Sequence, residues 1–147
     1  MGTRRQARES TLQILFQREF DDTSLEQVLS QYWEEKKSIK SVKEYSQLLV
    51  DGVLSHQAAI DSIIQSASEH WRISRMALVD RNILRIAVFE LFYEKDLAPA
   101  IVINEAIEIA KKYSGSQSAM FINGVLDAIL KNIHNFKKSL KDKENGE

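Results

Sequence analysis

Three arginines, Arg4, Arg5 and Arg8, stand close together at the beginning of the chain, in the first turns of a helix that we expect over residues 4–20. The N-terminus of a helix already carries partial positive charge, so an arginine there costs about 0.3–1 kcal/mol unless an anion lies nearby. Two interpretations remain open. The arginines form either a solvated helix end that tolerates this cost, or a site that binds phosphate together with the helix dipole.

Phe16 lies farther along the same expected helix, at the edge of its apolar stripe. A helix turns by about 100° per residue, which places the three arginines on the continuation of that stripe, between Leu12 and Leu15. An aromatic ring beside basic residues suits single-stranded RNA, which binds through phosphate contacts and base stacking. Core packing is the simpler explanation for Phe16 taken alone.

The familiar catalytic and metal-binding patterns are missing from the sequence. The absence of cysteine excludes disulfides, thiolate catalysis and cysteine-based metal sites. His56, His70 and His134 lie far apart, and none has a second ligand four residues away. Glycine-rich phosphate loops and the Gly-x-Ser-x-Gly elbow are also missing. We therefore predict a binding protein that is not an enzyme and that uses no metal or cofactor.

Composition favours one helical domain. The 147 residues include one proline and five glycines, too few for the many turns of a fold built from β-hairpins. The formal net charge is −1. No segment has the apolar length of a signal peptide or a membrane span, so we expect a cytoplasmic protein. The domain is placed at residues 1–138, and the lysine-rich tail, residues 139–147, is expected to fray.

Hydrophobic spacing predicts about seven helices in two small packed bundles that meet near the loop before Ser74. Two segments, Thr23-x-x-Glu26 and Ser41-x-x-Glu44, are typical of capping boxes at helix starts. Ser74 is expected to cap a long central helix. The apolar residues of that helix are too dense for a surface element: Ile83, Leu84, Ile86, Ala87, Val88 and Leu91.

Proline and glycine mark the later boundaries. Pro99 suits the first turn of a helix, and Gly115 suits a left-handed cap, with Ser116 capping the helix that follows. Gly124 interrupts that last apolar pattern, where glycine costs about 1 kcal/mol relative to alanine. Close helix packing is the simpler explanation for Gly124, and the close approach of a ligand is the alternative.

Four segments, in order along nearly the whole chain, resemble the NusB family of bacterial transcription antitermination factors. They are residues 4–9 (RRQARE), 79–91 (VDRNILRIAVFEL), 103–111 (INEAIEIAK) and 121–127 (FINGVLD). Any one of them alone would be a weak signal, whereas the four together are specific. The resemblance implies an all-α fold of two small helix bundles.

The resemblance also implies a function. Members of this family recognise a boxA-type single-stranded RNA and pair with NusE, which is also a small-subunit ribosomal protein. The assembly modifies RNA polymerase so that ribosomal RNA operons are read through. Carried over to this sequence, Arg4, Arg5 and Arg8 match the basic RNA contact of the family, and Phe16 and Phe121 match aromatic positions near the RNA.

Two further groups of residues follow from the resemblance. Gln117 stands just before the second aromatic position, where relatives can carry an acidic residue, so the RNA contacts around Gln117 and Ser118 are expected to differ in detail. Asp80 and the helix after it border the NusE surface of the family. We expect Asp80, Arg81 and Arg85 to be exposed polar residues at the rim of that interface.

A second class of function stays open at this point. The same domain resembles the N-terminal part of a ribosomal RNA cytosine methyltransferase, but this chain ends before a cofactor-binding domain could begin. The more serious alternative is a ribosome-assembly scaffold that does not read RNA sequence. Selective binding of boxA RNA over scrambled RNA separates the two, and the sequence leaves both a monomer and a homodimer open.

Overall fold

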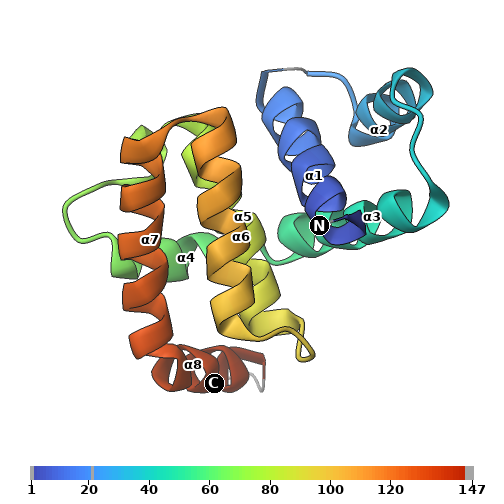
Figure 1. Ribbon diagram of the computed structural model, residues 1–147. Helices are drawn as coiled ribbons and strands as arrows, with labels where there is room; N and C mark the ends of the chain where they lie inside the picture. Colours follow the sequence, from blue (N-terminus) through green and yellow to red (C-terminus); the bar gives the residue numbers. More distant parts are fainter. Residues whose placement is uncertain (1, 21, 145–147) are drawn as a thin grey trace. The chain divides into compact units, whose positions relative to one another are not determined.

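The computed structural model describes residues 2–20 and 22–144 and divides into two compact units, Met1–Ser55 and His56–Glu147. Over the described residues, all regular elements are helical: eight α-helices and one short 3-10 helix, η1 (Figure 1). The all-α prediction is confirmed, with one helix more than the seven expected. The two units divide after Ser55, whereas the sequence suggested a boundary near the loop before Ser74.

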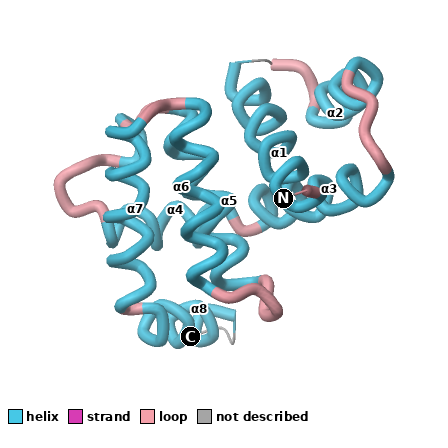
Figure 2. The backbone as a smooth tube through the Cα atoms, in the orientation of Figure 1, coloured by secondary structure: helices cyan, strands magenta, loops and turns pink. Residues whose placement is uncertain are grey.

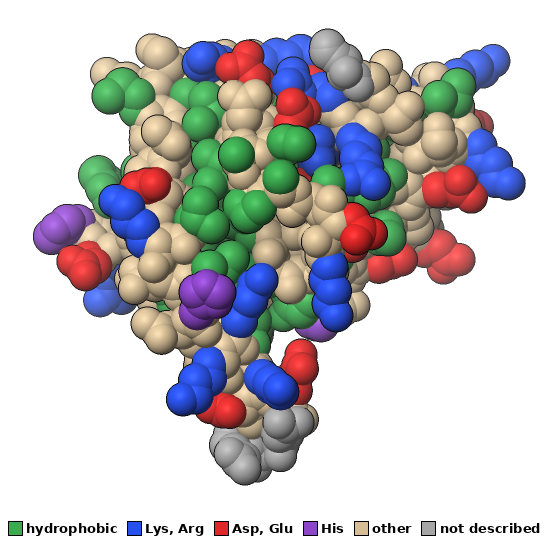
Figure 3. Space-filling model, turned by 60° about the horizontal axis from the view of Figure 1, so that its bottom comes forward, with side chains coloured by type: hydrophobic (Ala, Val, Ile, Leu, Met, Phe, Trp, Pro, Cys, Tyr) green, Lys and Arg blue, Asp and Glu red, His purple; other side chains and the backbone are tan. Residues whose placement is uncertain are grey.

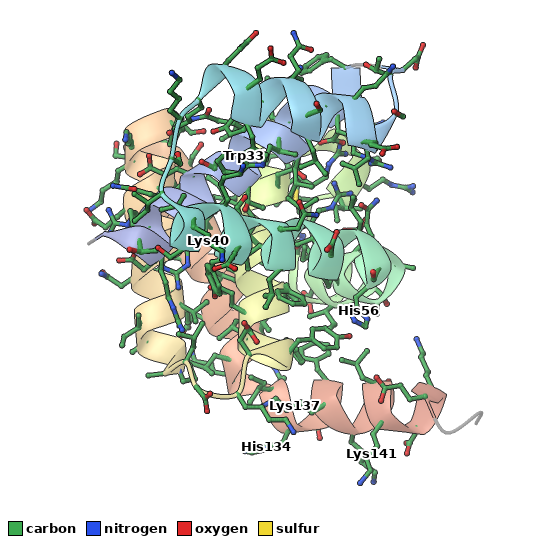
Figure 4. All side chains as sticks on the ribbon, turned by 90° about the vertical axis from the view of Figure 1, so that its right-hand side faces the viewer. Trp33, Lys40, His56, His134, Lys137 and Lys141 are labelled. Carbon is green, nitrogen blue, oxygen red and sulfur yellow. The ribbon has the colours of Figure 1, made fainter. Side chains whose placement is uncertain are left out.

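The first unit consists of α1 (Thr3–Phe20), α2 (Leu25–Glu35) and α3 (Lys40–Ser55). Helix α1 packs mainly against α3 (Figure 1). Ile14, Val28 and Val50 contribute one fully buried residue from each helix to the core. Trp33 packs against this core from the side of α2 that faces α3 (Figure 4). The apolar stripe predicted for the first helix is therefore confirmed.

The starts of α2 and α3 differ from the predicted capping boxes. Ser24, one residue after Thr23, caps α2, because its hydroxyl accepts a hydrogen bond from the Gln27 backbone N–H at 3.2 Å. Ser41 lies inside α3, since the backbone N–H of Val42 already donates to the Ile39 carbonyl. The α2 prediction missed by one residue, because Thr23 and Ser24 carry similar hydroxyls, and the α3 helix begins two residues earlier than a cap at Ser41 implies.

The second unit contains α4 (Gln57–Ala67), η1 (Ile73–Arg75), α5 (Leu78–Tyr93), α6 (Pro99–Tyr113), α7 (Ser116–Lys131) and α8 (Ile133–Glu144). Helices α6 and α7 lie side by side, and α5 packs against α4, α6 and α7 (Figure 1). Helix α5 is central, as predicted. All six apolar residues on which that prediction rested are buried: Ile83, Leu84, Ile86, Ala87, Val88 and Leu91.

The boundaries in the second unit confirm some predictions and correct others. Pro99 is the first residue of α6, and Gly115 has a φ of +105°, which favours glycine. Gly115 occupies the N-cap position of α7, so Ser116 opens that helix and does not cap it. Ser74 lies in η1, and the N-cap position of α5 is Ala77, which makes no side-chain cap. Figure 2 shows a loop between α4 and α5, and this segment includes the short helix η1.

The packing explanation for Gly124 is wrong. Gly124 is exposed on α7, and a Cβ atom added there would have nothing within 4 Å outside its own helix backbone. No neighbouring helix therefore requires a glycine at this position. The unfavourable helix propensity of glycine at this position is therefore not explained by packing.

Helix α8 carries the lysine-rich C-terminal segment. The described part of the predicted tail is helical through Glu144, and residues 145–147 lie outside the described residues. The Phe136 ring makes an edge contact with Phe92 of α5, with centroids 6.3 Å apart. Lys137 and Lys141 lie on α8 in Figure 4, and Figure 3 shows basic and acidic side chains together at the C-terminal end. Among the described helices, none is both long and apolar enough to cross a membrane.

Candidate nucleic-acid interface

The three N-terminal arginines differ in accessibility. Arg4 is exposed, and its guanidinium lies over the Tyr45 ring, 5.0 Å from the centroid. Arg5 is half-buried, whereas Arg8 is buried, with 3% of its surface exposed. The helix start thus offers Arg4 and Arg5 to an anion in solution. Arg8 is enclosed by the protein, which corrects the expectation that all three arginines contact phosphate directly.

The burial of Arg8 follows from its position on the helix. One turn later the same face carries Thr11 and Leu12, which are also buried. Thr11 hydrogen bonds to Ser46 of α3, with 2.9 Å between the hydroxyl oxygens. The arginines lie on the continuation of the apolar stripe, as the spacing indicated. Arg8 is therefore on the buried face of the helix.

Phe16 is half-buried and makes an edge contact with Phe20, whose ring is 67% exposed; the centroids are 4.9 Å apart. Phe16 follows Arg8 by eight residues, which is about 12 Å along the helix axis at 1.5 Å per residue. Phe16 and the arginines therefore share α1 but do not form one compact patch.

The second unit contains an aromatic pocket of about 270 Å³, lined by residues that include Trp71, Arg75, Asp80, Gln117, Ser118 and Phe121. Trp71 is 59% exposed and meets Phe121 edge to face, with centroids 6.2 Å apart. The structure thus brings together Gln117 and Phe121, as the sequence predicted for RNA contacts. Arg4, Arg5, Arg8 and Phe16 belong to the other unit.

The loop that carries Trp71 is held by one side chain of α4. The Gln65 amide nitrogen donates to the Trp71 carbonyl at 3.0 Å, and its oxygen accepts from the Ile73 backbone N–H at 2.9 Å. Arg81 of α5 also donates to the Ile73 carbonyl, at 3.3 Å. These bonds fix the backbone on both sides of Arg72, so the pocket has a defined wall although it is formed by a loop.

Asp80 lies in the first turn of α5 and is only 8% exposed. Its Oδ2 atom accepts a hydrogen bond from the Ser118 hydroxyl of α7 at 3.2 Å. Its Oδ1 atom is buried and accepts no hydrogen bond from any described residue. A buried carboxylate oxygen is costly to leave without a donor, so Oδ1 of Asp80 carries a desolvation cost that no hydrogen bond from the described residues offsets.

Arg85 is a buried structural residue. Its guanidinium makes a bidentate ion pair with Asp61 of α4, through distances of 2.8 and 2.9 Å. A third bond at 3.2 Å reaches the Asn82 side chain. The pair joins α4 to α5, and its planar geometry is the one that arginine and carboxylate favour.

The predicted exposure of the polar residues on α5 is therefore wrong for two of the three. Asp80 and Arg85 are 8% and 6% exposed, and only Arg81 is half-buried. Sequence periodicity failed here because the helix is surrounded by α4, α6 and α7, so its polar residues are paired inside the unit. Asp80 and Arg85 are therefore not the exposed polar residues that the sequence predicted.

Trp71 and Arg75 were not predicted from the sequence as site residues. Both are exposed and line the aromatic pocket, with Arg72 and His70 exposed in an adjoining hollow. The available signal was a tryptophan among basic residues in the segment His70-Trp71-Arg72-Ile73-Ser74-Arg75. Interleaving of this kind is typical of surfaces that bind single strands.

The three histidines show no shared site. His56, at the start of α4, stacks on Tyr93 with ring centroids 4.1 Å apart, whereas His134 is exposed on α8 (Figure 4). His70 is also exposed. No group of three or more histidine, aspartate or glutamate side chains in the described part of the chain is arranged to hold a metal ion.

Comparison with known proteins gives consistent matches along most of the chain. The NusB family model matches residues 5–131. The transcription antitermination protein NusB of Bdellovibrio bacteriovorus is 50% identical over 130 residues, covering 88% of this chain and 96% of that protein. The same protein of Trichlorobacter lovleyi is 43% identical over 129 residues, covering 88% and 91%.

Solved structures agree with these sequence matches. NusB of T. maritima aligns with a TM-score of 0.80 at 41% identity, covering 87% of this chain and 90% of that one. A chain in the crystal structure of the antitermination factors NusB and NusE in complex with dsRNA also aligns with a TM-score of 0.80. Its identity is 33%, and the alignment covers 89% of this chain and 98% of that one.

Proposed function

The chain belongs to the NusB family, and from that premise we propose that it is a transcription antitermination factor that binds boxA-type single-stranded RNA. It pairs with NusE, and together they modify RNA polymerase during transcription of ribosomal RNA operons. The proposal describes a cytoplasmic binding protein and not an enzyme. A structural relative that contains NusB, NusE and dsRNA supports both the RNA and the protein partner.

The observation that carries the RNA proposal is the Trp71–Phe121 pair with Arg75 beside it. Two aromatic rings at the surface offer stacking faces for bases, and an exposed guanidinium next to them offers a phosphate contact. Gln117 lines the same pocket and supplies an amide that pairs with base edges. Arg4 and Arg5 add phosphate contacts from the first unit, and Phe16 remains a candidate for stacking.

Fewer residues of α5 are proposed to contact the protein partner than the sequence predicted. Of the three residues predicted on α5, Arg81 reaches the surface and is kept as a candidate contact for NusE. Asp80 and Arg85 act inside the unit, where they hold α5 against α7 and α4.

The deciding experiment measures RNA affinity with and without NusE. Fluorescence anisotropy with a labelled boxA-type RNA and with a scrambled RNA of the same composition, at one fixed salt concentration, gives the specificity ratio directly. We expect the boxA-type RNA to bind more tightly, and the difference to grow when NusE is present. Equal affinity for the two RNAs, with NusE bound, favours the alternative of a ribosome-assembly scaffold without sequence-specific reading.

A further inference from the structure

We propose that three lysines of α8, Lys137, Lys138 and Lys141, bind the phosphates of RNA that flanks the boxA-type element, whatever the sequence of that flank. We call these residues the lysine strip. The inference rests on the proposed RNA binding and extends it beyond the recognised element. The NusB family model ends at residue 131, and α8 begins at Ile133. The family match therefore assigns no role to α8.

The lysine strip lies along one side of the helix. At about 100° per residue, its three members fall within an arc of about 100°. Asp142 and Glu144 both fall outside this arc, so the strip itself carries only positive charge. His134 lies one turn earlier on the same side, and from His134 to Lys141 the helix rises by about 10.5 Å. The three lysines and His134 are all exposed.

The packing of α8 determines which way the strip faces. Phe136 contacts Phe92 of α5, with ring centroids 6.3 Å apart. The pKa of Tyr93 in α5 is raised, first by burial and second by the negative charge of Glu144, so Glu144 also lies on the side of α5. In Figure 4, Lys141 extends from α8 away from α5. Three half-buried apolar residues thus attach the helix: Ile133, Phe136 and Leu140.

The folded unit itself does not use the charge of the strip. Among the described residues, none forms an ion pair with Lys137, Lys138 or Lys141. Lys141 and Lys143 lie in the last turn, where a cation interacts favourably with the helix dipole, but Lys137 and Lys138 lie before that turn. Lys137 and Lys141 are four residues apart, a spacing at which like charges destabilise a helix. A bound anion removes this repulsion.

The chemistry of the strip indicates phosphate and not a base. A lysine ammonium is a point charge on a flexible stem, which attracts phosphate without recognising the sequence. The nearest aromatic ring on α8, Phe136, packs against α5 and is not part of the strip. The strip therefore suits the backbone of a single strand, and it should bind any flanking sequence equally well.

RNA is favoured over the acidic surface of a protein partner, because the proposed function already holds RNA on the same unit. A strand bound near Phe121 reaches a second site on that unit at a high effective concentration. Phe121 and Lys131 are ten residues apart on α7, which is about 15 Å. About five nucleotides at about 3.4 Å each cover that length, and α8 follows directly after α7.

The test uses the full chain and two RNAs, the boxA-type element alone and the same element with about ten nucleotides added on each side, about twice the length required. For the unmodified protein we expect the longer RNA to bind more tightly. Its slope of log affinity against log salt should be steeper by about 2, from three contacts at about 0.7 each. A second, unrelated flanking sequence should give the same gain.

The triple variant Lys137→Gln, Lys138→Gln, Lys141→Gln should bind the two RNAs with equal affinity and equal slope. Its affinity for the element alone should match that of the unmodified protein. Glutamine has nearly the helix propensity of lysine, and circular dichroism checks that α8 is retained. The matched control replaces three exposed lysines of the first unit by glutamine and should keep the gain: Lys36, Lys37 and Lys40.

Three results would overturn the proposal. The unmodified protein could bind both RNAs with the same affinity and slope. The control variant could lose the gain as completely as the α8 variant, which would make it an effect of net charge. The α8 variant could keep the gain but bind NusE more weakly, which would assign the strip to an acidic surface of the partner. If the unmodified protein does not bind even the element alone, the proposed function itself fails.

A second measurement locates the flank directly. The chain has no cysteine, so Ser139→Cys places a single thiol on an exposed position of α8 outside the strip. A photo-crosslinker on this thiol should join to nucleotides of the flank, and the three lysine substitutions should abolish the crosslinks at equal saturation. Crosslinks only within the boxA-type element, or none at all, would show that the flank does not reach α8.

Discussion

The arginine start of α1 and the aromatic pocket of the second unit are both proposed to contact RNA, but they are built in different ways. The first uses Arg4 and Arg5 on one helix end, which attract any phosphate. The second joins a loop, the start of α5 and the start of α7 around a buried carboxylate. Attraction of the RNA backbone thus needs only the local sequence of one helix end, whereas a pocket that could hold a base needs distant segments brought together.

The largest expected effect is on the stability of the second unit, which contains the pocket. Arg85→Ala leaves Asp61 without its bidentate partner, which should lower the free energy of unfolding by about 3 kcal/mol. Urea denaturation followed by circular dichroism measures this. As a control, Lys131→Ala breaks an exposed pair with Asp127 and should cost less than about 1 kcal/mol. Similar costs for the two variants would mean that the Arg85–Asp61 pair does not hold the unit together.

The next prediction separates the contribution of base stacking to RNA affinity from the contribution of charge. Phe121→Ala should weaken RNA binding by about 1–3 kcal/mol, the range for a lost base–aromatic stack, while the dependence of affinity on salt stays the same. Met120→Ala is the matched control, since Met120 is the adjacent residue and is 75% exposed. A variant that binds RNA as tightly as the unmodified protein would remove Phe121 from the interface.

Removing the arginines, unlike removing Phe121, should change how RNA affinity depends on salt. The double variant Arg4→Ala, Arg5→Ala should flatten the slope of log affinity against log salt by about 1.4, from two contacts at about 0.7 each. Arg18→Ala removes an exposed arginine near the far end of α1 and serves as the control. If the double variant is folded and its slope is unchanged, the arginines are a tolerated helix end and not a phosphate site.

The smallest effect tests the exposed face of α7, the helix that carries Phe121. Gly124→Ala should raise the free energy of unfolding by about 0.5–1 kcal/mol, because nothing obstructs the added methyl group. Gly115→Ala should lower it, since its φ of +105° disfavours a side chain. Thermal unfolding of both variants gives the sign. A Gly124→Ala protein that is more stable but binds RNA less well would support close approach of a ligand at Gly124.

Much of the fold could be predicted because it depends on short-range order. The apolar repeat of α1, the dense apolar run of α5, Pro99 at the start of α6 and the positive φ of Gly115 each reflect a preference of a few adjacent residues. Helix caps were predicted less accurately. Thr23 and Ser24 carry similar hydroxyls, and only the path of the chain decided which of them accepts the Gln27 N–H.

The sequence by itself determined the helical class, the apolar faces, the cationic helix start and the resemblance to the NusB family. Only the tertiary structure decided which polar residues are reachable. Asp61 pairs with Arg85 across 24 residues, and Ser118 with Asp80 across 38. In each pair, a charged side chain is buried against a residue from a distant segment. The sequence does not show whether such a partner exists, and the cost of removing a charge from water depends on that partner. For the same reason the aromatic pocket, with its carboxylate and its two aromatic rings, exists only in the folded unit.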